Sequence, residues 1–202
     1  MKKLNEVIIQ EIGEIKKLPY LLNIRGNHGS TEDIYWGDEE TLVMESGPNA
    51  NCVTFCTEVI LRALKKMGLD KIIPADDAIL FRDHSFILNY SDYFWGMPAA
   101  VSTLGWGEII HVESSGELSA LKGGDVAQLW HINDLGKFRA GHNVIVLSGD
   151  SDLGRVNNHS ASNLKPEGHY ATYHNFVHEK NGFRREWMFA RLNEKTIRET
   201  YG

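Results

Sequence analysis

The chain has two cysteines, Cys52 and Cys56, and nine histidines, which are the residue types of a thiol nucleophile and its base. The cysteines are four residues apart in a segment with helical spacing. Neighbours one helical turn apart have poor geometry for a disulfide, so we expect two free thiols. Cys52 falls in the first helical turn, where the helix dipole and the free N–H groups favour a thiolate. Cys56 lies further in and is expected to be a packing residue.

A thiolate nucleophile needs a partner that takes and returns a proton. His142 begins a β-branched run that ends at Leu147, and strand alternation places it on the same side as Val144 and Val146. We expect this side to look toward the start of the Cys52 helix, with the two valines packed beneath it. Residues 123–130 should form the antiparallel neighbour of this strand, joined to it by a loop over 131–140.

Four short motifs resemble those of the NlpC-type papain-like cysteine peptidases and amidases. Asn51-Cys52-Val53-Thr54-Phe55 is similar to the Asp-Cys-Ser-Gly-Phe nucleophile motif of that family, with Val-Thr in place of Ser-Gly. The other three motifs follow in the family's order or precede the cysteine, as Gly124-Asp125-Val126, Gly141-His142-Asn143-Val144 and Ile34-Tyr35-Trp36-Gly37. The resemblance spans residues 34–176 as separate motifs, and their conjunction is more specific than any one of them.

The resemblance implies a cysteine peptidase or amidase that cleaves an amide bond of peptidoglycan, in the stem peptide or at the glycan–peptide junction. Cys52 would attack the amide carbonyl while His142 protonates the leaving amine, and water activated by His142 would then hydrolyse the thioester. The N–H of Cys52 is one expected oxyanion donor, and Tyr35 is a candidate for the second. No cofactor and no metal are expected.

A third catalytic residue should accept a hydrogen bond from the histidine and hold its tautomer. We expect it on the strand that follows the His142 strand, over residues 169–176. Alternation lets only one of His174 and Asn175 face the site. Asn175 is preferred, because an amide serves this purpose in papain-like proteins, and His159 in the preceding loop is a further candidate.

Other functions fit parts of the same pattern. Within the enzyme class, the chain could be an antibacterial amidase toxin or a phage lysin. Outside it, the alternatives are a catalytically inactive relative that binds peptide or glycan, and a structural domain in which Cys52 and His142 are only packed. A metal protein is disfavoured, because His169, His174 and His178 lie in a strand-and-turn pattern and no HExxH or paired CxxC motif is present.

The elements that would position these residues change in type along the chain. Helical periodicity marks residues 4–17 and, more strongly, 52–67, with Asn49 or Asn51 as N-cap and Gly68 as the stop signal. A long loop is expected over 23–51, and a helix with loops lining a cleft over 75–106. Strand patterns follow at 108–113, 125–131, 142–148, 169–176 and 184–192. This order predicts an α+β, papain-like NlpC-type fold in which the Cys52 helix packs on an antiparallel meander.

Composition sets the outer limits. With 202 residues and 42% hydrophobic content, we expect one domain over 1–202, of which 1–33 is a helix and loop extension. The net charge of −6 argues against a nucleic-acid partner, and no segment has the length of an apolar membrane span. No signal peptide is recognisable, which leaves the location open: the cell envelope or outside if a signal was removed, otherwise the cytoplasm.

Overall fold

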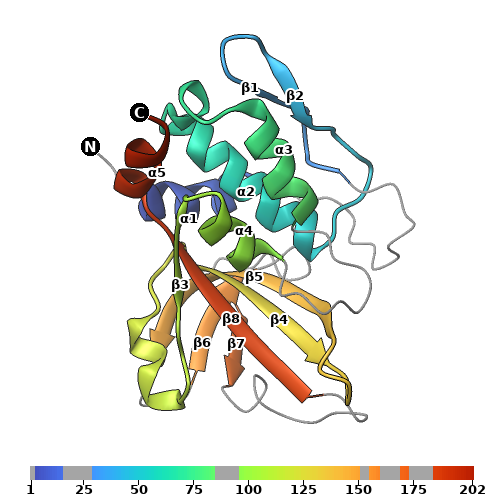
Figure 1. The fold of residues 1–202 in the computed structure, drawn as a ribbon, viewed down its shortest axis with the longest axis vertical. Helices are drawn as coiled ribbons and strands as arrows, with labels where there is room; N and C mark the ends of the chain where they lie inside the picture. The colour runs from blue at the N-terminus through green and yellow to red at the C-terminus, as the bar shows by residue number, and fades with distance from the viewer. Residues whose placement is uncertain (1–2, 16–28, 85–95, 151–154, 160–168, 173–183) are drawn as a thin grey trace.

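A computed structural model describes residues 3–15, 29–84, 96–150, 155–159, 169–172 and 184–202 (Figure 1). The α-helices in these ranges are α1 (Leu4–Glu14), α2 (Cys52–Lys66), α3 (Ala75–His84), α4 (Met97–Thr103) and α5 (Glu194–Tyr201), with short 3₁₀ turns η1 (Leu69–Lys71) and η2 (Ser115–Ala120). The strands are β1 (Ile34–Trp36), β2 (Thr41–Met44), β3 (Gly107–Ile110), β4 (Val126–Ile132), β5 (Phe138–Asp150), β6 (Arg155–His159), β7 (His169–Thr172) and β8 (Arg184–Leu192).

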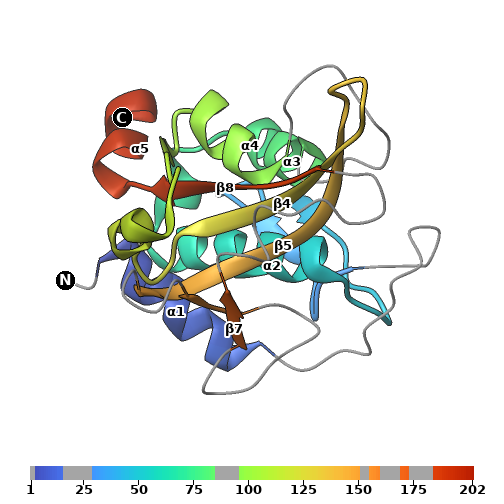
Figure 2. The same cartoon turned by 90° about the horizontal axis from the view of Figure 1, so that it is seen from below.

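The larger sheet has the strand order β3-β8-β4-β5-β6-β7, and every pairing in it is antiparallel. Helices α1 to α4 gather on one side of this sheet, and the β1–β2 hairpin lies beyond them (Figure 1). Seen from below, with the sheet in front of the helices, α2 passes behind β4 and β5 (Figure 2). The chain is therefore an α+β protein with antiparallel sheets, as the sequence predicts.

Helix α2 begins and ends where its sequence signals lie. The Asn51 side chain accepts hydrogen bonds from Val53 N and Thr54 N, both at 2.9 Å, and so satisfies two free N–H groups of the first turn. Lys65 and Lys66 occupy the last turn, and Gly68 follows in the left-handed conformation at φ 70°. The prediction of this helix and of its stop is confirmed, and of the two N-cap candidates, Asn49 and Asn51, the structure has Asn51.

The large sheet packs on both of its faces. On one face, Val126 and Ile145 belong to the main core together with α1 and α2. On the other face, Val144 and Val146 pack with Leu118 and other side chains of a second, smaller cluster. The alternation of Val144, Ile145 and Val146 between the two clusters tells which side of β5 looks toward α2.

Three features depart from the sequence predictions. Part of the predicted 23–51 loop forms the β1–β2 hairpin, in which Ile34 and Trp36 are buried and the indole N–H of Trp36 donates to Ile73 O at 2.8 Å. Strand β6 and helix α5 were not anticipated. The sheet is not a meander. After β7 at one edge, the chain crosses back so that β8 lies between β3, at the other edge, and β4.

Candidate active site

Cys52 is the first residue of α2, and its partly buried thiol meets strand β5. Three backbone N–H groups hydrogen-bond to the thiol: those of Asn143, Val53 and Cys52 itself. Two of them belong to the first turn of the helix, where Val53 N also donates to the Asn51 side chain, and the third comes from the strand. Together they form a small anion-stabilising nest around the sulfur.

The strand ladder explains why the N–H of Asn143 is available. Val146 bonds toward β4, donating to Asp125 O at 2.8 Å and accepting from Gly124 N at 2.9 Å. Backbone groups alternate along an antiparallel strand, so Asn143 points the other way, toward β6. In the described residues the pairing of β5 with β6 begins only at Ile145, opposite His159. The Cys52 thiol therefore meets β5 on its β6 side, next to the start of the described pairing with β6.

His142 is adjacent to this contact in the chain. Its Cα is about 2.4 Å from the nitrogen of Asn143 by standard peptide geometry, which puts it within about 6 Å of the Cys52 sulfur. That distance is within reach of an imidazole ring. The structure thus brings the backbone of the predicted base close to the predicted nucleophile, from segments 90 residues apart.

The expected orientation of the His142 strand is wrong in one respect. Val144 and Val146 pack in the second cluster with Leu118 and Leu121, on the face away from α2. The register of β5 against β4 is regular from His142 to Ile145, so His142 belongs to the face of Val144. The side chain that this part of β5 presents to the α2 side is Asn143. The part of β5 that meets the helix start is therefore the backbone of Asn143 rather than the side chain of His142.

Burial opposes the activation of Cys52. Removal from water disfavours the thiolate and raises the pKa of the thiol, while the N–H groups of Asn143, Val53 and Cys52 lower it by less. The expectation that the helix start alone favours a thiolate is therefore wrong in net direction. Burial raises the pKa of Cys56 well above its usual value, and this fully buried thiol lies in the main core, which confirms the packing prediction.

Tyr35 does not lie where an oxyanion donor is needed. It stands on β1 between the buried Ile34 and Trp36, so its ring points to the outer side of the hairpin and is 42% exposed. Its carbonyl accepts a hydrogen bond from Lys65 in the last turn of α2, the opposite end of the helix from Cys52. The oxyanion role expected from the motif does not fit this position.

The third catalytic residue stays open. His174 and Asn175 lie outside the described residues. Strand β7 pairs with β6 rather than with β5, so the strand at 169–172 is not the direct neighbour of His142 that we expected. The neighbour is β6, and His159 is its last residue. The sequence predicts a loop at His159, because the mostly polar run Arg155–His159 lacks the apolar alternation of a strand.

Asp125 of the Gly-Asp motif is an anchor for the sheet. It is fully buried and accepts hydrogen bonds from Arg191 Nε and Nη2, both at 2.8 Å, and from Lys122 N at 2.7 Å. Gly124 before it has φ 90°, and an added Cβ would lie 2.9 Å from the Asn5 backbone. Arg191 was missed by the sequence analysis, because nothing local to β8 marks it as the partner of a residue 66 positions earlier.

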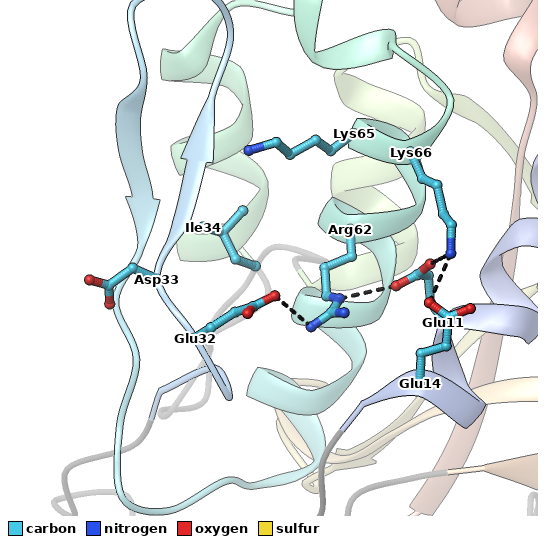
Figure 3. A pocket seen from close by; sticks show the side chains of 8 residues that line it. All are labelled: Glu11, Glu14, Glu32, Asp33, Ile34, Arg62, Lys65 and Lys66. Carbon is cyan, nitrogen blue, oxygen red and sulfur yellow. Dashed lines mark hydrogen bonds and ion pairs between the residues drawn. The ribbon is translucent and has the colours of Figure 1, made fainter.

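A second polar site lies between α1, α2 and the hairpin (Figure 3). It is a cleft of about 290 Å³ in which Arg62 bonds to Glu11 at 3.0 Å and to Glu32 at 2.9 Å. Lys66 bonds to Glu11 and Glu14, both at 2.8 Å. These cations are neutralised by protein carboxylates, so the cleft is an electrostatic joint between elements rather than an anion site.

Comparison with protein-family models, with curated proteins and with solved structures gave no significant match. Within the described ranges, no group of three or more His, Cys, Asp or Glu residues could hold a metal ion. No helix in those ranges is long and apolar enough to cross a membrane. The function is therefore argued from the site itself.

Proposed function

We propose that the chain is a cysteine-dependent amide hydrolase of the NlpC-type papain-like class, with Cys52 as nucleophile and His142 as base. One observation carries the proposal: the thiol at the N-terminus of α2 accepts the N–H of Asn143, the residue that follows Gly141-His142. Covalent amide hydrolysis uses a helix-start thiol and a histidine on a neighbouring strand, and the proposal requires the His142 ring to turn from the face of Val144 toward the thiol.

The proposed reaction proceeds in two stages. His142 takes the thiol proton as the Cys52 sulfur attacks the amide carbonyl, and it returns that proton to the amine as the C–N bond breaks. A water then attacks the thioester, its proton passes to His142, and the C–S bond breaks to release a carboxylic acid. The N–H of Cys52 would bind the developing oxyanion, and that of Asn143 would stabilise the thiolate.

The proposed substrate is peptidoglycan, cleaved in the stem peptide or at the glycan–peptide junction. Its support is the conjunction of the four motifs, and in particular the order Cys52, Gly124-Asp125, Gly141-His142. Within the enzyme class, an antibacterial toxin or a phage lysin would use the same residues on the same bond. Purified muropeptides of defined stem length distinguish the two bonds, because the products differ in whether they keep the sugar.

A catalytically inactive relative that binds peptide or glycan is the second candidate. The observation that favours it is the direction of the Cys52 pKa, which burial raises despite three N–H donors. A thiol that stays protonated at neutral pH is a poor nucleophile. In that case the chain would bind muropeptides without releasing an amine.

The deciding experiment compares wild type with Cys52→Ala, Cys56→Ala and His142→Ala in iodoacetamide labelling across pH and in hydrolysis of muropeptides. The hydrolase requires amine release that Cys52→Ala and His142→Ala abolish and that the matched control Cys56→Ala retains. It also requires that His142→Ala slow the labelling of Cys52. Binding without release, unchanged by Cys52→Ala, would establish the inactive relative. If the chain neither binds muropeptides nor is labelled without denaturant, Cys52 and His142 are only packing residues.

A further inference from the structure

Gln128 and Asn143 form a pair of buried carboxamides next to the Cys52 thiol. They are direct cross-strand partners on β4 and β5, and their side chains are 0% and 1% exposed. Because Val146 bonds toward β4, the Gln128 and Asn143 positions form a non-hydrogen-bonded pair, in which side chains stand closest. Both lie on the face that carries Val126 and Ile145 toward α2.

Most of the polar atoms of this pair are unsatisfied. Gln128 Oε1 accepts the backbone N–H of Met97 at 2.9 Å, at the start of α4. Gln128 Nε2 and both Asn143 Oδ1 and Nδ2 have no hydrogen-bond partner among the described residues. Buried amides without a partner are costly, and native proteins usually satisfy them with an ordered water.

The thiol lies beside the same pair. Its sulfur accepts the N–H of Asn143, which is about 1.5 Å from the Asn143 Cα, so the sulfur is within about 5 Å of that Cα. An internal water needs two to four polar partners, and one here could accept from Gln128 Nε2 and donate to Asn143 Oδ1. Its second hydrogen would then be free to reach the sulfur.

We propose that the Asn143 and Gln128 carboxamides bind an internal water molecule beside the Cys52 thiol, and that this water hydrates the thiolate. The binding of the water stands on the two amides alone, whereas its effect on the nucleophile rests on the proposed function. Such a water gives a buried sulfur part of the solvation that burial removes. The ionisable group that interacts electrostatically with Cys52 is Cys56 on its own helix, and His142 precedes Asn143 on β5 with its side chain on the opposite face.

The first test is a crystal structure of the full chain at near-atomic resolution, with Asn143→Leu as the matched apolar variant. We expect a water within hydrogen-bond distance of both carboxamides in the wild type and its loss in the variant. Direct bonds between the amides, or to other protein groups with no water between them, would overturn the proposal. Cys52→Ala should keep the water, which separates its binding from any catalysis.

The second test measures, in solution, the direction of the change in Tm and in the labelling rate of Cys52. If the water is bound, Asn143→Leu lowers Tm, whereas removal of a truly unpartnered amide would raise it and overturn the proposal. Asn143→Leu should also slow iodoacetamide labelling of Cys52 at neutral pH by about tenfold, since it removes a hydrogen bond to a charged group. Val144→Ala, on the opposite face, controls for lost packing: it should lower Tm and leave the labelling rate unchanged. An ordered water in a chain without hydrolase activity would refute only the proposed function.

Discussion

At the scale of single residues, the environment of Cys52 is a balance of two opposed effects. The helix start and the β5 edge supply three N–H donors, which favour the thiolate, and burial favours the thiol. The sequence shows the first effect, because an N-cap asparagine followed by a cysteine can be read directly. It does not show the second, because burial depends on how closely β5 approaches the helix. The net direction of the pKa therefore needed the structure.

Asp125 gives the first prediction at this scale. Its carboxylate is buried and held by two bonds from Arg191, so Arg191→Ala would leave an unpaired charge inside the sheet. We expect a loss of about 3 to 5 kcal/mol in the free energy of unfolding, measured by urea denaturation. Arg198→Ala is the matched control, since its partner Glu194 is on the surface and such pairs contribute at most about 1 kcal/mol. Equal losses in the two variants would contradict the anchor role.

At the scale of elements, the N-cap of α2 positions Cys52. Asn51 accepts from Val53 N and Thr54 N, so Asn51→Ala removes both bonds and frays the turn that carries Cys52. The expected cost is about 1 kcal/mol, with faster hydrogen exchange in the first turn of the helix. Asn51→Asp keeps an acceptor at the cap and should keep most of the stability. If the alanine variant exchanges no faster than the aspartate variant, Asn51 does not hold this turn.

Helix α5 is attached through Tyr201. Its hydroxyl lies 2.7 Å from Asp77 Oδ2 and 2.8 Å from Leu104 O, and it accepts the indole N–H of Trp106 at 3.2 Å. Burial, followed by the nearby Asp77, raises the pKa of Tyr201 to about 12.

The pH dependence of stability follows from the direction of this shift. A folded-state pKa above the unfolded value of about 10 means that the native state binds the phenolic proton more tightly. The stabilisation is complete below about pH 10 and is lost as pH rises toward 12. Tm measured from pH 9 to 12 should therefore fall more steeply for wild type than for Tyr201→Phe, which has no such proton. Parallel curves would mean that Tyr201 titrates alike in both states.

The elements differ in how far local sequence predicts them. Helix α2 has caps at both ends and an apolar stripe, and it was predicted within one residue of its observed end. The β1–β2 hairpin was missed because its strands are only three and four residues long and lie in a segment rich in turn-forming residues. Strand β6 was missed because Val156 is its only apolar residue, and backbone pairing with β5 and β7 needs no apolar alternation.

At the scale of the whole molecule, the order of the strands decides which residues meet. Local periodicity predicts that β8 is a strand, but not that it lies between β3 and β4. The alternation of side chains along a strand does not specify which strand it pairs with. The same limit applies to the candidate site. The pairing of Cys52 with His142 stays a prediction from their motifs, whereas Gln128, Asn143 and Arg191 gain their significance only from register and packing.

The electrostatic joint of Figure 3 connects three elements far apart in the sequence. Arg62 on α2 bonds to Glu11 of α1 and to Glu32 before the hairpin, and lies 3.5 Å from Glu58. Glu58 is buried, and burial raises its pKa while Thr31 and Arg62 lower it. Arg62→Met keeps an unbranched apolar stem and removes the charge, so the two buried carboxylates, Glu11 and Glu58, lose their shared cation.

The final prediction is the pH dependence of that variant. Without Arg62 the pKa of Glu58 rises further, so its charged form is penalised in the folded state and the penalty is relieved as pH falls through the raised pKa. Arg62→Met should therefore lose about 3 kcal/mol of unfolding free energy near pH 7, and the deficit should shrink toward pH 5. Adding Glu58→Gln should remove most of this pH dependence, because the titrating group is gone. A deficit that stays constant with pH in urea denaturation would mean that Arg62 stabilises the joint by packing of its aliphatic stem rather than by charge.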